Sequence, residues 1–354
     1  MRVAAVPAAA GLLRRAFLGG AGAAAWALAA PAGAQSRPAD MPSPALRFGV
    51  LPVGGTFESR RNWEPVLGDM GRAVGRPVAS LSVLSYESLE RAIARNQVDL
   101  AFLSGKLALD AVLQRRMRVV AEVERVEGRA AGHRAVLLAR KAPPFDSLDA
   151  LLAAPQRWRI ARGDSRSVSG YIVPQAQLFL PHGIDIETRF VGEVIGTHQE
   201  TALAVANGDA DVATNNTTDL ERFRQQFPVE AARLQVIWQS EPTPPAQIVV
   251  RTDWPRELQQ RVQGFLLAYG RDPGPRGEPQ REVLRALHAA RGYRFADNSA
   301  LLPVARLEHQ LARQRALAGQ WVSEEARRAR LARLEAEHAR QVRWLEQTES
   351  ASKT

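Results

Sequence analysis

Cysteine is absent from the 354-residue chain. Its absence excludes disulfide bonds, thiol chemistry, cysteine-based metal sites and a lipidated N-terminal cysteine. The six histidines show no metal-ligand spacing. The sequence also lacks the Gly-Lys-Ser/Thr ending of a nucleotide P-loop, the glycine fingerprint of a dinucleotide-binding fold and a Gly-x-Ser-x-Gly elbow. Kinase, dehydrogenase and hydrolase chemistry therefore has no motif here, and we expect neither a cofactor nor an enzymatic activity.

The N-terminal segment has the features of an export signal. Arg14 and Arg15 precede an apolar stretch with three glycines, and small residues lead up to Ala34. The stretch is shorter than the roughly 20 residues that span a bilayer, which disfavours a transmembrane anchor. We expect residues 1–34 to be a twin-arginine signal peptide and 35–45 a disordered lead-in. The mature protein is then soluble in the periplasm of a Gram-negative cell.

The charge balance favours anionic partners. The formal net charge is +10 at pH 7, and residues 1–34 carry three arginines and no acidic residue, so the remainder carries +7. The arginines are scattered and no basic run is interleaved with aromatic residues, which argues against nucleic acid as a partner. A positive balance of this kind favours small anionic ligands.

Segments of strand and helix length alternate from residue 46 onward. The expected elements are a strand over 46–50, a helix over 63–74, a strand over 78–84, a helix over 86–96 and a strand over 98–103. Such alternation predicts an α/β protein with mainly parallel sheets and helices on both faces.

Two apolar runs, at 135–139 and 247–250, are not followed promptly by a crossover helix, and we interpret them as crossover strands between two lobes. The first lobe is then discontinuous, over 46–138 and 245–306, and the second covers 139–244. The elements predicted in the second lobe are helices at 147–153, from about 169, at 198–207 and at 217–225, and strands at 158–161, 188–191, 210–213 and 234–238.

The C-terminal segment 307–354 is rich in Ala, Leu, Glu and Arg, with apolar residues at near-helical spacing. This pattern predicts two helices. They either cover the outside of the first lobe or form the contact of a homodimer.

The segment GDSRSVSG at 163–170 lies between an apolar strand and an apolar helix. Small residues let the backbone approach a ligand, and the free N–H groups and dipole of a helix start favour negative charge. The hydroxyls of Ser167 and Ser169 add donors for the same anion. The alternative is that both serines only cap the helix.

Three further residues are predicted at the same edges of the sheets. His198 opens a helix after a strand in the second lobe, while Tyr86 starts a helix and Ser104 follows a strand in the first. Open α/β sheets bind ligands at the carboxyl ends of their strands, so these residues are expected to face one cleft. For His198 a capping or surface role is the alternative.

Four segments together carry a family resemblance: VDLA at 98–101, the serine segment at 163–170, ALAVANG at 202–208 and DVATNNT at 211–217. With them the chain resembles the periplasmic phosphonate-binding proteins of ABC transporters, in the type II binding-protein superfamily. The resemblance extends from about residue 46 to beyond residue 306. It implies a two-lobed fold joined by two crossover strands.

The resemblance implies that Ser167, the backbone of Val168, Ser169 and His198 hold phosphonate oxygens, with Tyr86 closing from the other lobe. The chain departs from the family at several positions. Val168 replaces a threonine, and a second family tyrosine falls at Leu103.

The acidic residues that receive the ammonium group in aminoalkylphosphonate binders fall at about Thr218, a candidate ligand contact, and Ala246. A buried ammonium without a carboxylate costs several kcal/mol. This disfavours 2-aminoethylphosphonate and favours methylphosphonate, phosphite or phosphate.

The implied function is that of the periplasmic binding component of an ABC importer. The lobes close on a small phosphorus oxyanion, and the loaded protein docks on a membrane permease. Three alternatives remain open from the sequence: a ligand-sensing module for a membrane receptor, a binder of another small anion such as a sulfonate, and an enzyme.

Overall fold

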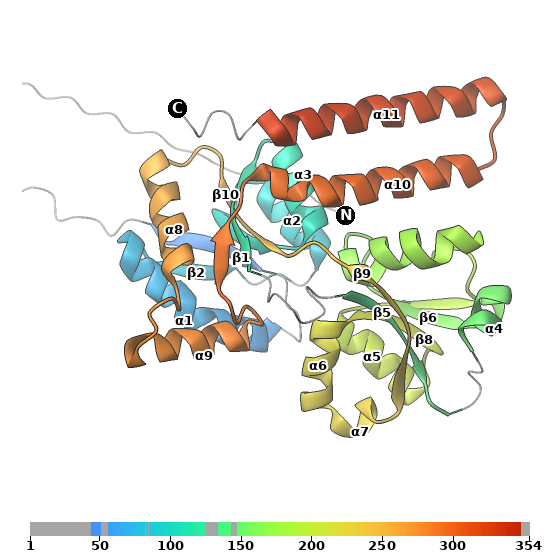
Figure 1. Ribbon diagram of the computed structural model, residues 1–354, viewed down its shortest axis with the longest axis horizontal. Coiled ribbons are helices and arrows are strands. Elements are labelled where there is room, and N and C mark those ends of the chain that lie inside the picture. Colours follow the sequence, from blue (N-terminus) through green and yellow to red (C-terminus); the bar gives the residue numbers. More distant parts are fainter. Residues whose placement is uncertain are drawn as a thin grey trace, which may run out of the picture. The chain divides into compact units, whose positions relative to one another are not determined.

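The computed structural model describes residues 44–50, 56–81, 83, 85–124, 134–142 and 147–347, and Figure 1 shows its elements. The predicted signal peptide and nearly all of the predicted lead-in lie outside the described residues. Among the described helices, none has both the length and the apolar character needed to cross a bilayer.

The first lobe is built on a six-stranded sheet with strand order β11-β4-β10-β3-β1-β2. β1 pairs in parallel with β2 and β3, whereas β10 is antiparallel to β3 and β4, and β11 is antiparallel to β4. The strands are β1 (Leu46–Val50), β2 (Val78–Leu81), β3 (Leu100–Leu103), β4 (Met117–Val123), β10 (Gln247–Arg251) and β11 (Tyr293–Phe295).

Helices cover both faces of this sheet, so its central strands are mostly buried on both sides. Along β3, Leu100 belongs to one apolar core and Ala101 to the other, as the alternation of side chains along a strand requires. The core with Leu100 includes α1 (Thr56–Val74), α8 (Arg256–Ala268) and α9 (Glu278–Ala286). The core with Ala101 includes α2 (Tyr86–Ala94) and α3 (Gly105–Leu113).

The second lobe is built on a five-stranded sheet with strand order β7-β6-β8-β5-β9. Its strands are β5 (Arg134–Arg140), β6 (Arg159–Arg162), β7 (Gly192–Ile195), β8 (Val212–Asn216) and β9 (Leu234–Pro242). Its helices are α4 (Leu148–Ala153), α5 (His198–Asn207), α6 (Thr217–Gln226) and α7 (Pro228–Ala231), together with a run of short helical segments over 168–182. Two apolar cores again lie on the two sides of the sheet.

One predicted strand of the second lobe is wrong. The segment 188–191 forms a turn, in which the N–H groups of Thr188 and Arg189 both donate to Asp185 O. Phe190 forms an edge-on contact with Phe179 rather than entering a strand pair. Parallel pairing with β6 begins only at Gly192, so the edge strand lies four residues later than the apolar pattern indicates.

The two runs interpreted as crossovers are full members of the sheets. β5 pairs antiparallel with β8 and β9, and β10 lies between β3 and β4. The chain therefore passes between the sheets before Arg134 and again between Pro242 and Gln247. The predicted division at residues 138 and 139 is corrected accordingly, because 134–138 pair within the second sheet.

The C-terminal segment forms the two predicted helices, α10 (Leu302–Ala318) and α11 (Glu324–Gln347), which run side by side in Figure 1. α11 contributes Leu345 to a core of the first lobe. α10 contributes Val304 to that same core and Leu311 to a core of the second lobe. The tail thus does more than cover the first lobe, since α10 packs against both.

Candidate functional site

The parallel strands of each lobe bring the predicted site residues to one edge. β6 pairs in parallel with β7 and β8, so the segments that follow these three strands lie at the same end of the second sheet. Those segments are the serine segment at 163–170, the start of α5 at His198 and the start of α6 after Asn216. In the first lobe, Ser104 follows β3 in the same way.

The serine segment is held as a closed loop by glycine and by Thr214. Gly163 N donates to Gly170 O (3.1 Å), and the Thr214 hydroxyl donates to Gly170 O (2.6 Å) while accepting from Gly163 N (3.2 Å). A Cβ at Gly170 would lie 2.8 Å from Ser167 Oγ and 3.1 Å from His198 Cε1. Glycine is required here because the two ends of the loop meet backbone to backbone.

Ser167 caps the helical run that follows the loop. Its hydroxyl accepts from Gly170 N (3.0 Å), and its side chain is buried. The helix predicted from about Ser169 begins as a π-helix, Val168–Ile172, a wider turn that is frequent at functional sites. The Val168 side chain is in the apolar core, so only its backbone is available to a ligand.

Ser169 and His198 are in direct contact. Ser169 Oγ lies 3.1 Å from His198 Nε2, and Asn216 Nδ2 donates to the same hydroxyl (3.3 Å). His198 is positioned by the capping box of α5, in which Thr197 and Glu200 bond each other's backbone N–H groups, and by Asn215, whose Nδ2 donates to His198 O (2.6 Å). Two of the predicted anion ligands are therefore brought together although 29 residues separate them.

Burial sets the charge of His198. Burial lowers the pKa of His198 below its ordinary value, and this effect outweighs the Asp219 carboxylate and the Thr214 backbone, which act in the opposite direction. The imidazole is therefore neutral at pH 7 without a ligand. A bound anion favours the charged form, so the same ring gains a proton or donates its N–H when an oxyanion arrives.

Tyr86 reaches this loop from the first lobe. The hydroxyls of Ser167 in the second lobe and Ser104 in its own lobe both act on the phenol, in the direction that lowers its pKa. Burial raises the pKa of Tyr86, and the carboxylates of Asp164 and Asp219 add to the rise, so the phenol stays protonated as a donor. Tyr86 is placed by the Ser85 capping box at the start of α2.

A charged pair also joins the two lobes beside the loop. Arg166 Nε donates to Glu90 Oε2 on α2 (2.8 Å), and Arg166 Nη1 lies 3.3 Å from Asp164 Oδ1. This pairing could not be predicted from the sequence, because its partners are 76 residues apart and Glu90 lies in no recognisable motif.

The start of α6 holds two site-edge residues that were not predicted, Asn216 and Asp219. Asn216 bonds Ser169, and Asp219 Oδ2 lies 4.0 Å from His198 Nε2. The predicted Thr218 lies between them in the first turn of α6, half-buried, with no hydrogen bond to Ser167, Ser169 or His198 among the described residues. The sequence signal that could have indicated these two residues is the DVATNNT segment at 211–217, which ends where α6 begins.

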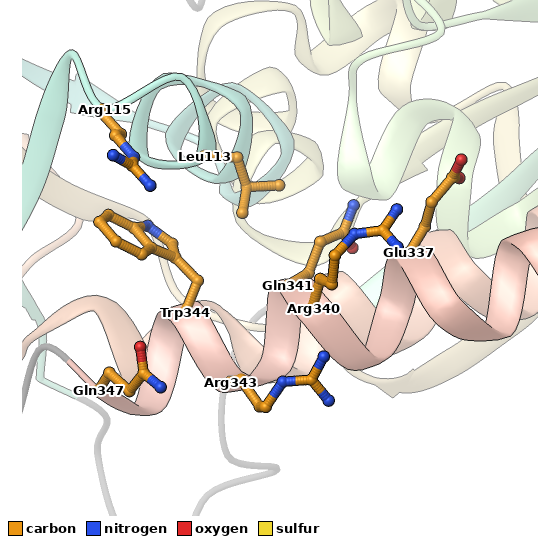
Figure 2. A pocket seen from close by; sticks show the side chains of 8 residues that line it. All are labelled: Leu113, Arg115, Glu337, Arg340, Gln341, Arg343, Trp344 and Gln347. Atoms are coloured by element: carbon orange, nitrogen blue, oxygen red, sulfur yellow. The ribbon is translucent and has the colours of Figure 1, made fainter.

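A recess of about 440 Å³ lies between the end of α3 and α11, away from the serine loop. Figure 2 shows Arg115 facing the Trp344 indole, with the guanidinium carbon 4.4 Å from the ring centroid. None of the predicted site residues lines this recess. Within the described residues there is also no cluster of three or more His, Asp or Glu side chains suited to a metal ion.

Two α/β lobes, linked by two chain passages and carrying facing hydroxyl groups at their strand ends, define a two-lobed binding protein. Residues 48–301 match the family model of the periplasmic substrate-binding proteins of phosphonate ABC transporters. The chain belongs to this family.

Individual relatives agree with the family. The phosphonates-binding periplasmic protein of Escherichia coli is 30% identical over 263 residues, which cover 74% of this chain and 75% of the relative. A crystal structure of a binding protein component of an ABC phosphonate transporter from Pseudomonas aeruginosa has a TM-score of 0.77 at 28% identity, covering 88% of this chain and 99% of that one.

The fold is shared with a solved complex as well. PhnD1 from Prochlorococcus marinus, in complex with methylphosphonate, has a TM-score of 0.65 at 17% identity and covers 75% of this chain and 98% of its own. Together these matches establish the two-lobed periplasmic binding fold predicted from the sequence.

Proposed function

We propose that this protein captures a small phosphorus oxyanion between its two lobes and delivers it to the membrane permease of an ABC importer. The observation that carries the proposal is the convergence of Ser167, Ser169, His198 and Tyr86 at one set of strand ends. All four bear hydrogen-bond donors suited to an anion, and they come from both lobes.

The donors present suffice for capture at low ligand concentration. A hydrogen bond to a charged group contributes about 1.5–3 kcal/mol. Four such bonds, from Ser167, Ser169, His198 and Tyr86 or from the backbone at Val168, reach the roughly 8 kcal/mol of micromolar binding.

Closure of the lobes is supported by the contacts that already join them. Arg166 donates to Glu90 across the two lobes (2.8 Å), and the Ser167 hydroxyl acts on the Tyr86 phenol of the other lobe. The ligand must bind this arrangement more tightly than an open one in order to shift the population toward it. We propose that the lobes hinge about the connections between the two sheets, of which the one between Pro242 and Gln247 is described.

The ligand proposed is small. The positions that would hold an ammonium group carry Thr218 and Ala246, neither of which bears a charge. Methylphosphonate, phosphite and phosphate therefore fit better than 2-aminoethylphosphonate.

Export and assembly complete the proposal. Residues 1–34 carry the twin-arginine pattern, and the protein would act in the periplasm. A homodimer through α10 and α11 stays a prediction, which light scattering on the purified mature protein can test.

Isothermal titration calorimetry of the mature protein tests the ligand class. Methylphosphonate, phosphite and phosphate should bind in the micromolar range or tighter, and 2-aminoethylphosphonate more weakly. Ser169→Ala should weaken methylphosphonate binding about tenfold or more, because one hydrogen bond to a charged group is lost.

Ser147→Ala is the matched control. Ser147 caps α4 in the same lobe by accepting from Ala150 N (3.1 Å), but it lies outside the cluster, so its loss should leave affinity unchanged. Equal effects of the two substitutions, or tightest binding of the amino compound, would contradict the assignment.

A further inference from the structure

A carboxylate flanks the proposed oxyanion site. Asp219 lies in the first turn of α6, its side chain is only 15% exposed, and its Oδ2 is 4.0 Å from His198 Nε2. Ser169 Oγ lies 3.1 Å from the same nitrogen. The charge of Asp219 also acts on the Tyr86 hydroxyl, where it adds to the raised pKa of the phenol.

The arginines around this carboxylate are engaged by partners. Arg222 Nη1 lies 3.3 Å from Asp219 Oδ1, and Arg222 Nε lies 3.2 Å from His288 Nε2 of the first lobe. Arg166 bonds Glu90 and Asp164. The groups next to Ser169 and His198 are hydroxyls, an amide and a buried imidazole, with the Asp219 carboxylate beside them, which is an unfavourable setting for a dianion.

Asp219 has accepting capacity left. Its Oδ2 accepts from Asn216 Nδ2 (2.7 Å) and its Oδ1 from Arg222 Nη1 (3.3 Å), whereas a carboxylate offers about four lone-pair positions. The same Asn216 amide donates to Ser169 Oγ (3.3 Å). One amide group thus holds the carboxylate next to a predicted anion ligand.

We propose that Asp219 accepts a hydrogen bond from a protonated ligand oxygen, so that the site selects the monoanion of a phosphonate, phosphite or phosphate and rejects sulfonates. The inference rests on the proposed function. A phosphorus oxyanion retains an acidic proton near neutral pH, so it can donate P–OH to the carboxylate while its other oxygens accept from the hydroxyls. A sulfonate has no such proton. Its oxygens and the carboxylate are both hydrogen-bond acceptors, so they cannot bond each other and their negative charges repel.

Calorimetry with methylphosphonate and methanesulfonate, between pH 5.5 and 8.5, tests the inference on the wild-type protein. Methylphosphonate affinity should fall up to tenfold per pH unit once the ligand loses its second proton, and methanesulfonate should bind at least a hundredfold more weakly at pH 6. Repeating the titration in buffers of different ionisation enthalpy should show the uptake of close to one proton per ligand at pH 8.5.

The Asp219→Asn variant tests whether the proton taken up on binding lies between Asp219 and the ligand. In this variant, proton uptake at pH 8.5 should disappear and the preference for methylphosphonate over methanesulfonate should shrink at least tenfold. Glu221→Gln is the control, because Glu221 lies on the same helix, is exposed and pairs only with Arg224 among the described contacts. It should behave as the wild type.

Two outcomes would overturn the inference: wild-type binding of methylphosphonate without proton uptake, or uptake that persists in Asp219→Asn and so belongs to His198. The wild-type measurement decides the first even if the variant folds poorly. Failure of the proposed function looks different, since then none of the three phosphorus ligands binds at any pH.

Discussion

At the scale of single residues, the proposed site consists of side chains that are uncharged without a ligand and can donate hydrogen bonds to an anion. His198 is the main example. Burial keeps its imidazole uncharged, and Ser169 and Asn215 hold it at the edge where the serine loop ends. Such a ring costs the folded protein little at pH 7 and offers an N–H to a ligand.

The His198 environment predicts a pH dependence of stability. The folded-state pKa is lowered below the unfolded value of about 6.5, so as the pH falls below that value the unfolded chain takes up a proton that the folded protein does not. The contribution of His198 to stability is therefore present above pH 6.5 and lost as the pH falls toward the folded pKa.

Urea unfolding without ligand, at pH 7.5 and 5.5, measures this effect. The free energy of unfolding of the wild type should fall by about 1 kcal/mol more than that of His198→Gln over this range. Parallel pH profiles for the two proteins would show that the imidazole is not held neutral.

At the scale of elements, the contact between α3 and α10 leaves no room for a side chain at Gly105. A Cβ at this position would overlap the buried side chain of Val304. Gly105 directly follows Ser104, so the close approach of the tail helix also positions a residue of the proposed site.

Gly105→Ala should therefore destabilise the protein by about 1–3 kcal/mol through overpacking. Combining it with Val304→Ala should cost less than the sum of the two single substitutions, because the smaller side chain makes room for the new methyl group. Urea unfolding of the four proteins of this cycle is the measurement. Strict additivity would mean that the two helices adjust independently.

At the scale of the whole molecule, two connections among the described residues join the lobes in addition to the chain passages and the Arg222–His288 contact. One is the contact between α2 and the serine loop, where Glu90 bonds Arg166. The other is α10, which pairs Glu308 with Lys106 of the first lobe (3.4 Å) and Arg315 with Glu187 of the second (3.5 Å). Any opening that separates the lobes must break the Glu90–Arg166 ion pair. It must also move α10 with one lobe or shift it relative to both.

Glu90→Gln should loosen the closed arrangement. Partly exposed ion pairs contribute about 0.2–1 kcal/mol, so the dissociation constant for methylphosphonate should rise up to about fivefold, and more at low salt than at high. Glu87→Gln is the control on the same helix, because Glu87 pairs within α2, with Arg91. Calorimetry at two salt concentrations compares them, and equal effects would argue against an interlobe role for Glu90.

Much of the fold and part of the site could be predicted from the sequence. Apolar runs of the right period and capping residues such as Ser85 and Thr197 determine where most helices and strands form, because these signals act over a few residues. The small residues of the serine loop likewise indicate a backbone that can approach an anion. The strand predicted over 188–191 is wrong, because this segment forms a turn and its Phe190 packs against Phe179.

Only the tertiary structure decided which groups share the site. Asp219 and Glu90 carry no distinguishing local pattern, and Asn216 is marked only as part of the DVATNNT segment. These residues meet Ser169, His198 and Arg166 through strand order and lobe packing. The same holds for α10, whose amphipathic sequence indicates a buried face but not that the face covers two lobes. Local periodicity specifies elements, whereas contacts between residues far apart in the chain depend on how those elements pack.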